Sequence, residues 1–413
     1  MEEELLRDIS AKYLLPFFSG AKLETDAAQS DGRDKKVSYI NPQVIGFKVN
    51  KKDRYRLQFK RDQPFAQKSD PAREARVIEA FTEILGEMEA ALASQLKDDL
   101  LSTFQRRVAA RAVADQTSEK ATLSVVDQLA QWATRQYEGA PISSAVGIST
   151  EDVEGLQLTL NDIASNDFGA VLSNGFDTLL EFNQGLKFVA HRVLAPDPHI
   201  PVHYCPWRHT AIAQWTSGAS ERIAIVLNRL GEILIFRQGQ LLFARRGGTW
   251  HFLTHEPVIR QMSIPRDQNI RKAIYETALD ASFSRTGACI GVVSYESAGK
   301  WAEIVAPTDL LEVASSTKTK AIKQIVGDRK FQDLDRTLRQ ELVAIDGSTV
   351  IDHTGRIVAV GAILKIGGGS ISGGRTAAAQ QLGTMGLGVK VSQDGGITGF
   401  RQKEKGAAAF RVM

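Results

Sequence analysis

Scarce cysteine and missing catalytic motifs narrow the functions open to this chain of 413 residues. Its two cysteines, Cys205 and Cys289, lie far apart, which excludes a disulfide scaffold and favours a reducing compartment. The sequence shows no catalytic triad, Walker loop, paired metal-binding histidines on a helix or Cys-x-x-Cys pair. Common hydrolases, NTPases and thiol enzymes are therefore not expected.

Long hydrophobic runs and a strong net charge are also missing. No stretch reaches the ~20 apolar residues of a membrane helix, and the start Met1-Glu2-Glu3-Glu4 is unlike a signal peptide. A net charge of +3 is too small to indicate nucleic-acid or membrane binding. We therefore expect a cytoplasmic protein without a membrane or nucleic-acid partner.

Changes of pattern along the chain predict three regions. Residues 1–140 combine strand-like runs with a long helix over 71–108, which Asp70 caps and which pairs with a second helix over 123–137. The apolar stripe of the long helix could alternatively form a dimer interface. Residues 141–264 alternate short strands with turns, and the expected strands include 168–172 and 211–215.

Two clusters in the middle region contain residues that could carry chemistry. His199, His203, Cys205 and His209 are close in sequence, but their spacing matches no closed zinc site, so turn packing is expected and no metal. Arg245, Arg246 and Trp250 flank a glycine turn. Two guanidinium groups and an indole suit a phosphate and a stacked base; the alternative is a solvated strand end with a packed tryptophan.

Residues 342–399 hold the pattern around which the rest is organised. An apolar run over 342–345 is expected to be a strand that delivers Asp346, Gly347 and Ser348 to its end. The runs 349–352 and 356–365 are expected to pair as a hairpin around His353-Thr354-Gly355. This order predicts that the carboxylate of Asp346 lies beside the hairpin.

A glycine-rich loop over 367–374 then leads into a helix over 377–382. Glycine lets backbone N–H groups approach an anion, the helix points its positive end at it, and Arg375 offers a planar fork to phosphate. The spacing is neither that of a Walker loop nor that of a dinucleotide fingerprint. A flexible connector is the alternative.

The order of these parts resembles the diadenylate cyclase family, the nucleotide-binding domain found at the N-terminus of DisA. That family has an Asp-Gly-Ala motif, then Gly-Thr-Arg-His-Arg-Ala-Ala at the start of a helix. The matching segments here are Asp346-Gly347-Ser348, Gly373-Gly374-Arg375-Thr376-Ala377, the hairpin over 390–397 and an early strand over 286–293. The resemblance covers about the last third of the chain. It implies a nucleotide site built from Asp346, Gly347, Ser348, Gly373, Gly374, Arg375 and Thr376.

The departures from the family bear on activity. In the cyclases the aspartate activates a ribose hydroxyl with a metal, and two arginines and a histidine hold the triphosphate; here Thr376 and Ala377 stand where the histidine and second arginine should be. Losing such a cation weakens transition-state stabilisation more than it weakens ligand binding. This favours a sensor over a synthase, in line with divergent prokaryotic relatives regarded as nucleotide-sensing modules.

The resulting expectation is an α/β protein. A mixed-sheet, diadenylate-cyclase-like domain over 265–413 follows a strand-rich α+β region and an N-terminal helical pair. We expect a degenerate signalling domain that binds a nucleotide or cyclic dinucleotide, with a homo-oligomer or an effector protein as partner. One alternative is an active cyclase that makes cyclic di-AMP from two ATP, with Asp346 as catalyst and Mg or Mn as cofactor. Another is a structural adaptor that binds no nucleotide and acts through the long helix.

Overall fold

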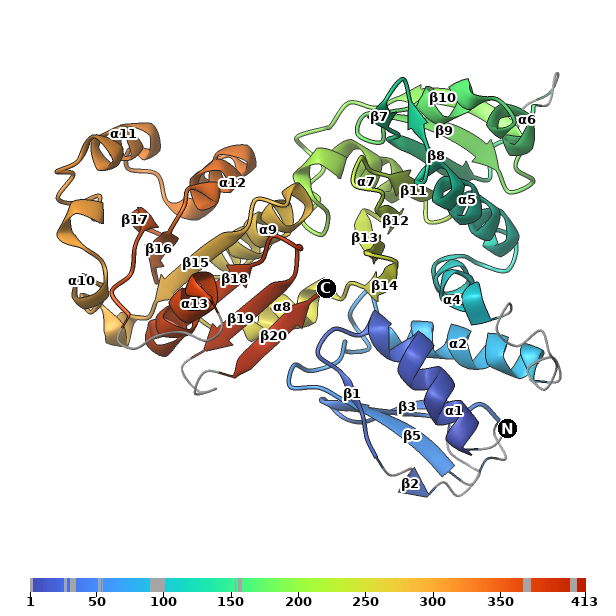
Figure 1. Ribbon diagram of the computed structural model, residues 1–413, viewed down its shortest axis with the longest axis horizontal. Coiled ribbons are helices and arrows are strands. Elements are labelled where there is room, and N and C mark those ends of the chain that lie inside the picture. Colours follow the sequence, from blue (N-terminus) through green and yellow to red (C-terminus); the bar gives the residue numbers. More distant parts are fainter. Residues whose placement is uncertain are drawn as a thin grey trace. The chain divides into compact units, whose positions relative to one another are not determined.

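The computed structural model describes residues 3–25, 28–29, 35–50, 53, 55–89, 101–152, 154, 158–366, 373–401 and 407–413. The chain packs as two units, Met1–Thr254 and His255–Met413, and Figure 1 traces their helices and strands. Each unit contains a sheet with both parallel and antiparallel neighbours, so the fold is mixed α/β. Within the described ranges, no helix is long and apolar enough to cross a membrane.

The first unit contains two sheets and six labelled α-helices among its described residues. The helices are α1 (Glu3–Ile9), α2 (Glu74–Met88), α4 (Phe104–Val113), α5 (Glu119–Trp132), α6 (Leu160–Ala164) and α7 (Thr210–Ser217). The smaller sheet has the order β1-β5-β4-β3, with β2 also paired to β5, from β1 (Lys22–Leu23), β2 (Ala28–Gln29), β3 (Val37–Asn41), β4 (Val44–Phe47) and β5 (Tyr55–Lys60). A short pair joins β6 (Gln136–Tyr137) to β7 (Ala140–Pro141).

The larger sheet of this unit has seven strands in the order β10-β9-β8-β11-β12-β13-β14. They are β8 (Ser144–Ser149), β9 (Thr178–Asn183), β10 (Phe188–Val193), β11 (Ile223–Leu227), β12 (Ile233–Arg237), β13 (Gln240–Arg246) and β14 (Thr249–Phe252). One apolar cluster runs from Leu6 through the helices to Trp250 and includes residues of both sheets. Whether residues 1–140 and 141–264 form separate regions stays a prediction.

Three local predictions for this unit are wrong. Helix α2 begins at Glu74, with Arg73 as its extended N-cap residue, whereas the Asp70 carboxylate accepts a hydrogen bond from the Gln67 backbone N–H. Residues 168–172 fall largely in the 3-10 turn Asp167–Val171, and 211–215 lie in α7. Short apolar runs fit both periods, and in α7 the helical spacing of Ala211, Ile212 and Trp215 buries all three. Part of the predicted long helix, residues 90–100, lies outside the described residues.

The second unit is built on a six-stranded sheet of order β17-β16-β15-β18-β19-β20. Its strands are β15 (Ala288–Val293), β16 (Ser348–Asp352), β17 (Ile357–Ala362), β18 (Gly386–Val391), β19 (Ile397–Arg401) and β20 (Ala408–Val412). Its helices are α8 (His255–Gln261), α9 (Gln268–Ser284), α10 (Trp301–Ile304), α11 (Thr317–Val326), α12 (Arg336–Ala344) and α13 (Gly374–Met385). Strands β15 and β16 are parallel, and the other neighbours in the sheet are antiparallel.

Helices cover both faces of this sheet. Helix α13 lies across one face, where Leu382 packs over Gly291 and the Ala379 carbonyl approaches Gly388 (Figure 1). On the other face, Thr349 of β16 donates to the Leu342 carbonyl of α12 at 3.5 Å. Because side chains alternate along a strand, Cys289 and Ser348 project towards the α13 face.

Ion pairs fasten the two helices of the far face to each other. Arg336 of α12 binds the buried Asp280 of α9 through two N–O contacts of 2.7 and 2.9 Å. One turn away, Arg339 donates to Glu276 at 2.8 Å. Paired and bidentate in this way, the buried carboxylates are compensated, so α12 is held firmly where it delivers the chain to β16.

The strands predicted over 349–352 and 356–365 are confirmed as β16 and β17, and the predicted helix over 377–382 lies within α13. The strand predicted over 342–345 is wrong, because Leu342 and Val343 belong to α12. Both residues are buried, as a helix anchored by α9 can bury them without pairing in a sheet. Asp346 therefore lies between a helix and the start of β16, at the opposite end of β16 from the hairpin turn.

Candidate functional site

The predicted nucleotide-binding residues of the second unit gather at the sheet edge where β15 and β16 begin. These strands run parallel with Ile290 opposite Thr349, so the residues that precede them, Gly287 and Gly347, come to the same edge. The first turn of α13 reaches this edge as well, because Arg375 contacts Gly287. Three segments distant in sequence are thus brought together by the parallel pair and the helix.

Arg375 lies against the backbone at the start of β15. A Cβ atom added to Gly287 would be 2.6 Å from Nη1 of Arg375, and the Gly287 backbone has a φ of +65°. The Arg375 side chain is half-buried, which limits its freedom while leaving part of it accessible. Its guanidinium is thus positioned by packing, at the positive end of a helix of 12 residues.

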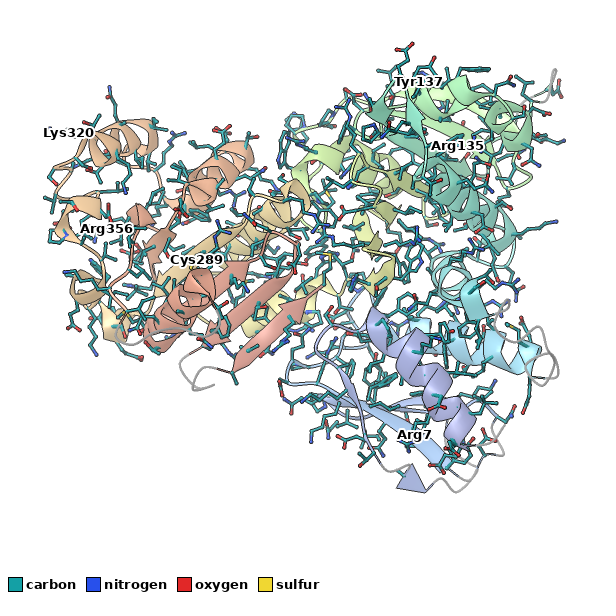
Figure 2. All side chains as sticks on the ribbon, viewed as in Figure 1. Arg7, Arg135, Tyr137, Cys289, Lys320 and Arg356 are labelled. Carbon is teal, nitrogen blue, oxygen red and sulfur yellow. The ribbon has the colours of Figure 1, made fainter. Side chains whose placement is uncertain are left out.

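Ser348 and Cys289 are buried near this arginine, and Figure 2 labels the cysteine. Burial raises the pKa of Cys289 to about 11, although a hydrogen bond with Ser348 and the charge of Arg375 act in the opposite direction. The thiol is therefore protonated at neutral pH and is no nucleophile.

Asp346 and Gly347 form an exposed turn that enters β16. Asp346 is exposed, and Gly347 has a φ of +108°. A Cβ atom on Gly347 would lie 2.5 Å from the carbonyl carbon of Gly361 in β17, so only glycine fits this crossing of two backbones. The close approach fixes the turn while the carboxylate of Asp346 stays accessible to solvent and ligand.

An ion pair next to this turn was not predicted from the sequence. Lys318 of α11 donates to Asp309 at 2.7 Å and to the Gly361 carbonyl at 2.9 Å. Gly361 is the residue that Gly347 approaches, so Lys318 places a cation next to the Asp346 turn. No local motif marks it, because Lys318 reaches Gly361 only through the packing of α11 beside β17.

The helix start contributes the remaining predicted residues. Gly373 has a φ of +80°, with nothing near its Cα that a Cβ would meet, and its carbonyl accepts from the Thr376 N–H at 3.1 Å. Gly374 is exposed and Thr376 is half-buried. Ala377 is buried, so the position that carries the second arginine in the cyclases faces the core here. Residues 367–372 of the glycine-rich loop lie outside the described residues.

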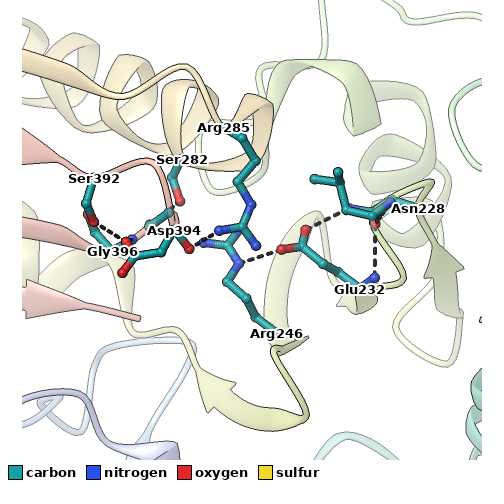
Figure 3. A network of polar contacts seen from close by, with 10 residues as sticks. Asn228, Glu232, Arg246, Ser282, Arg285, Ser392, Asp394 and Gly396 are labelled. Atoms are coloured by element: carbon teal, nitrogen blue, oxygen red, sulfur yellow. Dashed lines mark hydrogen bonds and ion pairs between the residues drawn. The ribbon is translucent and has the colours of Figure 1, made fainter.

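The β18–β19 turn is fixed beside the same edge, since Val391 pairs with Ala288. Figure 3 shows its polar contacts: Ser282 of α9 donates to the Gly395 carbonyl at 2.5 Å, and Arg285 donates to the Asp394 carbonyl. Hydrogen bonds from the Ser392 hydroxyl and the Gly396 N–H lower the pKa of Asp394. The turn is a rigid border of the site.

Arg245, Arg246 and Trp250 belong to the first unit and are held by its own residues. Arg246 and Glu232 are buried and paired at 2.7 Å, and Asn228 donates to the same carboxylate at 2.7 Å (Figure 3). Trp250 is buried edge-on against Phe243. Arg245 and Trp250 line a cavity of about 120 Å³. Their role as ligand contacts stays a prediction.

Among the described residues, no group of three or more His, Cys, Asp or Glu side chains is arranged to hold a metal ion. Cys205 and His209 are buried, and the His209 ring contacts the Gly175 carbonyl at 2.9 Å. Asp346 offers one accessible carboxylate, which fits a magnesium ion brought by a nucleotide, because Mg²⁺ often takes one protein carboxylate with phosphate and water.

Comparisons with known proteins give a limited result. No protein-family model and no curated protein matches the chain. Among solved structures, a double mutant of DacA from Staphylococcus aureus matches with 18% identity over 36% of this chain and 88% of that chain. The TM-score is 0.25, too low to identify the fold.

Proposed function

We propose that residues 255–413 bind a nucleotide or cyclic dinucleotide and report its presence to a partner. The observation that carries this proposal is the position of Arg375 at the sheet edge where the Asp346-Gly347 turn begins β16. A phosphate at this edge would meet a guanidinium and the first backbone N–H groups of α13. The sequence resemblance to the diadenylate cyclases names the same residues.

The missing second arginine favours sensing over synthesis. Ala377 is buried, so no cation extends from that position, and Lys318 stands on the other side of the Asp346 turn. Lys318 pairs with Asp309 at 2.7 Å, so Arg375 is the cation proposed to hold a bound, unreacting phosphate. A triphosphate held for in-line attack would require several cations on the same group.

Titration calorimetry with purified full chain tests the proposal. The panel contains ATP, GTP, the nucleoside monophosphates and the adenine and guanine cyclic dinucleotides, with and without magnesium. At least one member should bind. Arg375→Ala should lower the affinity for that ligand by about tenfold or more, since charge-assisted hydrogen bonds contribute about 1.5 to 3 kcal/mol. Lys320→Ala, an exposed lysine of α11, is the matched control and should leave affinity unchanged.

A panel in which no member binds would reject the proposal. Equal loss of affinity in Arg375→Ala and Lys320→Ala would show that the ligand lies elsewhere on the chain. A structural adaptor predicts the first of these outcomes, together with no effect of either substitution on function in cells.

A second candidate function is an active diadenylate cyclase, which the retained and exposed Asp346 favours. In that case Asp346 would hold the divalent metal that the nucleotide brings and orient the ribose hydroxyl that attacks. Incubation of the chain with ATP and magnesium or manganese, followed by mass spectrometry, should detect cyclic di-AMP, and Asp346→Ala should abolish it. A product that survives in Asp346→Ala would come from another catalyst or a contaminant.

A further inference from the structure

A cavity of about 380 Å³ lies in the second unit, between the end of α11 and the turn that joins β16 to β17. It is at the opposite end of β16 from Asp346, because Thr354 and Arg356 of that turn line it. Its volume falls near the lower limit of small-molecule sites, which is roughly 300 Å³. Val326, Ile357 and Val358 give it an apolar floor.

Basic side chains dominate the polar part of the lining. Lys323, Arg329, Lys330 and Arg356 line the cavity, against two acidic residues, Glu312 and Asp328. All four basic residues are exposed, so their charges are hydrated and available at the rim. The cavity therefore favours an anionic ligand.

Arg356 is oriented towards the cavity by the turn itself. Its Nε lies 3.3 Å from Oδ2 of Asp352, and its side chain is still 55% exposed. The Asp352 carboxylate is occupied by Thr354, whose N–H and hydroxyl donate to it at 2.9 and 2.7 Å. Burial raises the pKa of Asp352, but these hydrogen bonds outweigh it and lower the pKa. Nη1 of Arg356 also lies 3.8 Å from Oε2 of Glu312, whose side chain is 81% exposed. Because this pair is open to solvent, an anionic ligand can compete with Glu312 for the guanidinium.

Basic side chains also lie at the C-terminal end of α11, where an anion would otherwise be repelled. A helix C-terminus carries partial negative charge, which would repel one. Arg329 offsets this charge by donating to the carbonyls of Ile325 at 2.6 Å and Val326 at 3.1 Å. Lys323 contacts the Glu312 carbonyl at 3.5 Å, which brings its ammonium group to the rim.

Trp301 supplies a flat wall. It begins α10, is half-buried, and packs on the apolar cluster beneath α13. An indole beside guanidinium groups can stack on a planar ligand. The lining thus combines an aromatic ring with basic side chains.

We infer that this cavity is a second ligand site, which takes a small organic anion with a planar apolar part and one anionic group such as a carboxylate, sulfonate or phosphate. The apolar part lies against Trp301 and the floor, and the anionic group lies between Arg356 and Lys330. The site is separate from the Arg375 edge and does not depend on the proposed nucleotide function.

The probe for the test is 8-anilinonaphthalene-1-sulfonate, an aromatic anion, compared with the neutral N-phenyl-1-naphthylamine. Trp301 is the one tryptophan of residues 255–413, so energy transfer that Trp301→Phe removes reports binding at this cavity. The double variant Lys323→Glu/Lys330→Glu should lower the affinity for the anionic probe by about tenfold. Lys320→Glu, on the same helix but outside the lining, is the matched control (Figure 2).

Three results together support the site: loss of the energy-transfer signal in Trp301→Phe, weaker binding of the anionic probe in the double variant, and unchanged binding of that probe in Lys320→Glu. Salt gives a second measurement on the unaltered chain, because it should weaken the anionic probe and leave the neutral one unchanged. The inference is overturned if Trp301→Phe keeps the full signal. It is equally overturned if both probes respond alike to salt or to the double variant, or if Lys320→Glu weakens the anionic probe as much.

Discussion

The guanidinium of Arg375 occupies the space that a side chain at position 287 would need. A Cβ atom on Gly287 would lie 2.6 Å from Nη1 and 3.1 Å from Cζ of Arg375. This contact joins the start of β15 to the first turn of α13 across nearly ninety residues of sequence, and it decides where the cation of the candidate site points.

Gly287→Ala should therefore weaken nucleotide binding nearly as much as Arg375→Ala, about tenfold, because the added methyl group displaces the guanidinium. The substitution also strains a backbone with a φ of +65°. Gly299→Ala controls for that strain, since Gly299 has a φ of +84° and nothing within 4 Å of the added atom. Calorimetry on the three variants decides: equal loss in Gly299→Ala would attribute the effect to strain rather than to Arg375.

Gly347 and Gly361 predict a graded effect on stability. In Gly347→Ala the new Cβ meets backbone atoms of Gly361 and Ala362 at 2.5 to 2.8 Å, whereas in Gly361→Ala its nearest contact, at 2.6 Å, is the Ile345 methyl group. Backbone cannot yield as a side chain can, so Gly347→Ala should cost more than the about 1 to 3 kcal/mol of backbone strain alone. Urea unfolding should show the largest loss of stability in Gly347→Ala, a smaller loss in Gly361→Ala and the smallest in Gly299→Ala. Equal midpoints for Gly347→Ala and Gly299→Ala would contradict the close approach.

The first unit should lose stability in mild acid through His209. Burial, opposed by the Gly175 carbonyl and Glu232, lowers the pKa of His209 from its usual 6.5 to about 4. The unfolded chain therefore binds the proton more tightly, and the contribution is fully present above pH 6.5 and is lost as the pH falls towards 4. The largest possible loss is about 3 kcal/mol.

Urea unfolding at several pH values checks this, with His209→Gln as the variant. His209→Gln should flatten the pH dependence of the free energy of unfolding in that interval. His251, whose pKa burial also lowers to about 4, leaves a residual slope of the same sign. An unaltered slope in His209→Gln would mean that His209 is not held neutral by burial.

How much of this could be predicted from the sequence depends on the range of the interactions. Strands β16 and β17 and helix α13 follow from local periodicity and turn residues, and they were predicted. The sequence also predicts a strand over the nearby run 342–345, because four apolar residues fit the helical and the strand period equally well. The ion pairs between α12 and α9 select the helix. As a result, Asp346 is predicted to follow a strand, whereas it follows a helix.

The contacts that build the site join residues far apart in the chain, so the sequence alone could not predict them. The motif residues Asp346 and Arg375 could be named by resemblance, but the packing of Arg375 on Gly287 depends on the parallel register of β15 and β16. Lys318 carries no sequence signal of its own, since its role rests on the Gly361 carbonyl 43 positions away. The basic cavity at α11 likewise draws its residues from four separate segments.

The packing of α13 on the sheet gives a last prediction. It tests whether the position of this helix matters for ligand binding, apart from the residues that touch the ligand. Gly388→Ala would place a Cβ atom 1.8 Å from the Ala379 carbonyl oxygen, with two more atoms of the Ala379 backbone within 3.0 Å, so the helix itself must move. Gly291→Ala meets only the Leu382 side chain, at 2.6 Å, which can repack. We expect Gly388→Ala to destabilise the second unit by about 3 kcal/mol or more and to weaken the nucleotide ligand, because the first turn of α13 carries Arg375. Gly291→Ala should lose less stability and keep its affinity. Calorimetry and urea unfolding on both variants test this, and full affinity in a folded Gly388→Ala variant would show that ligand binding does not depend on where α13 lies.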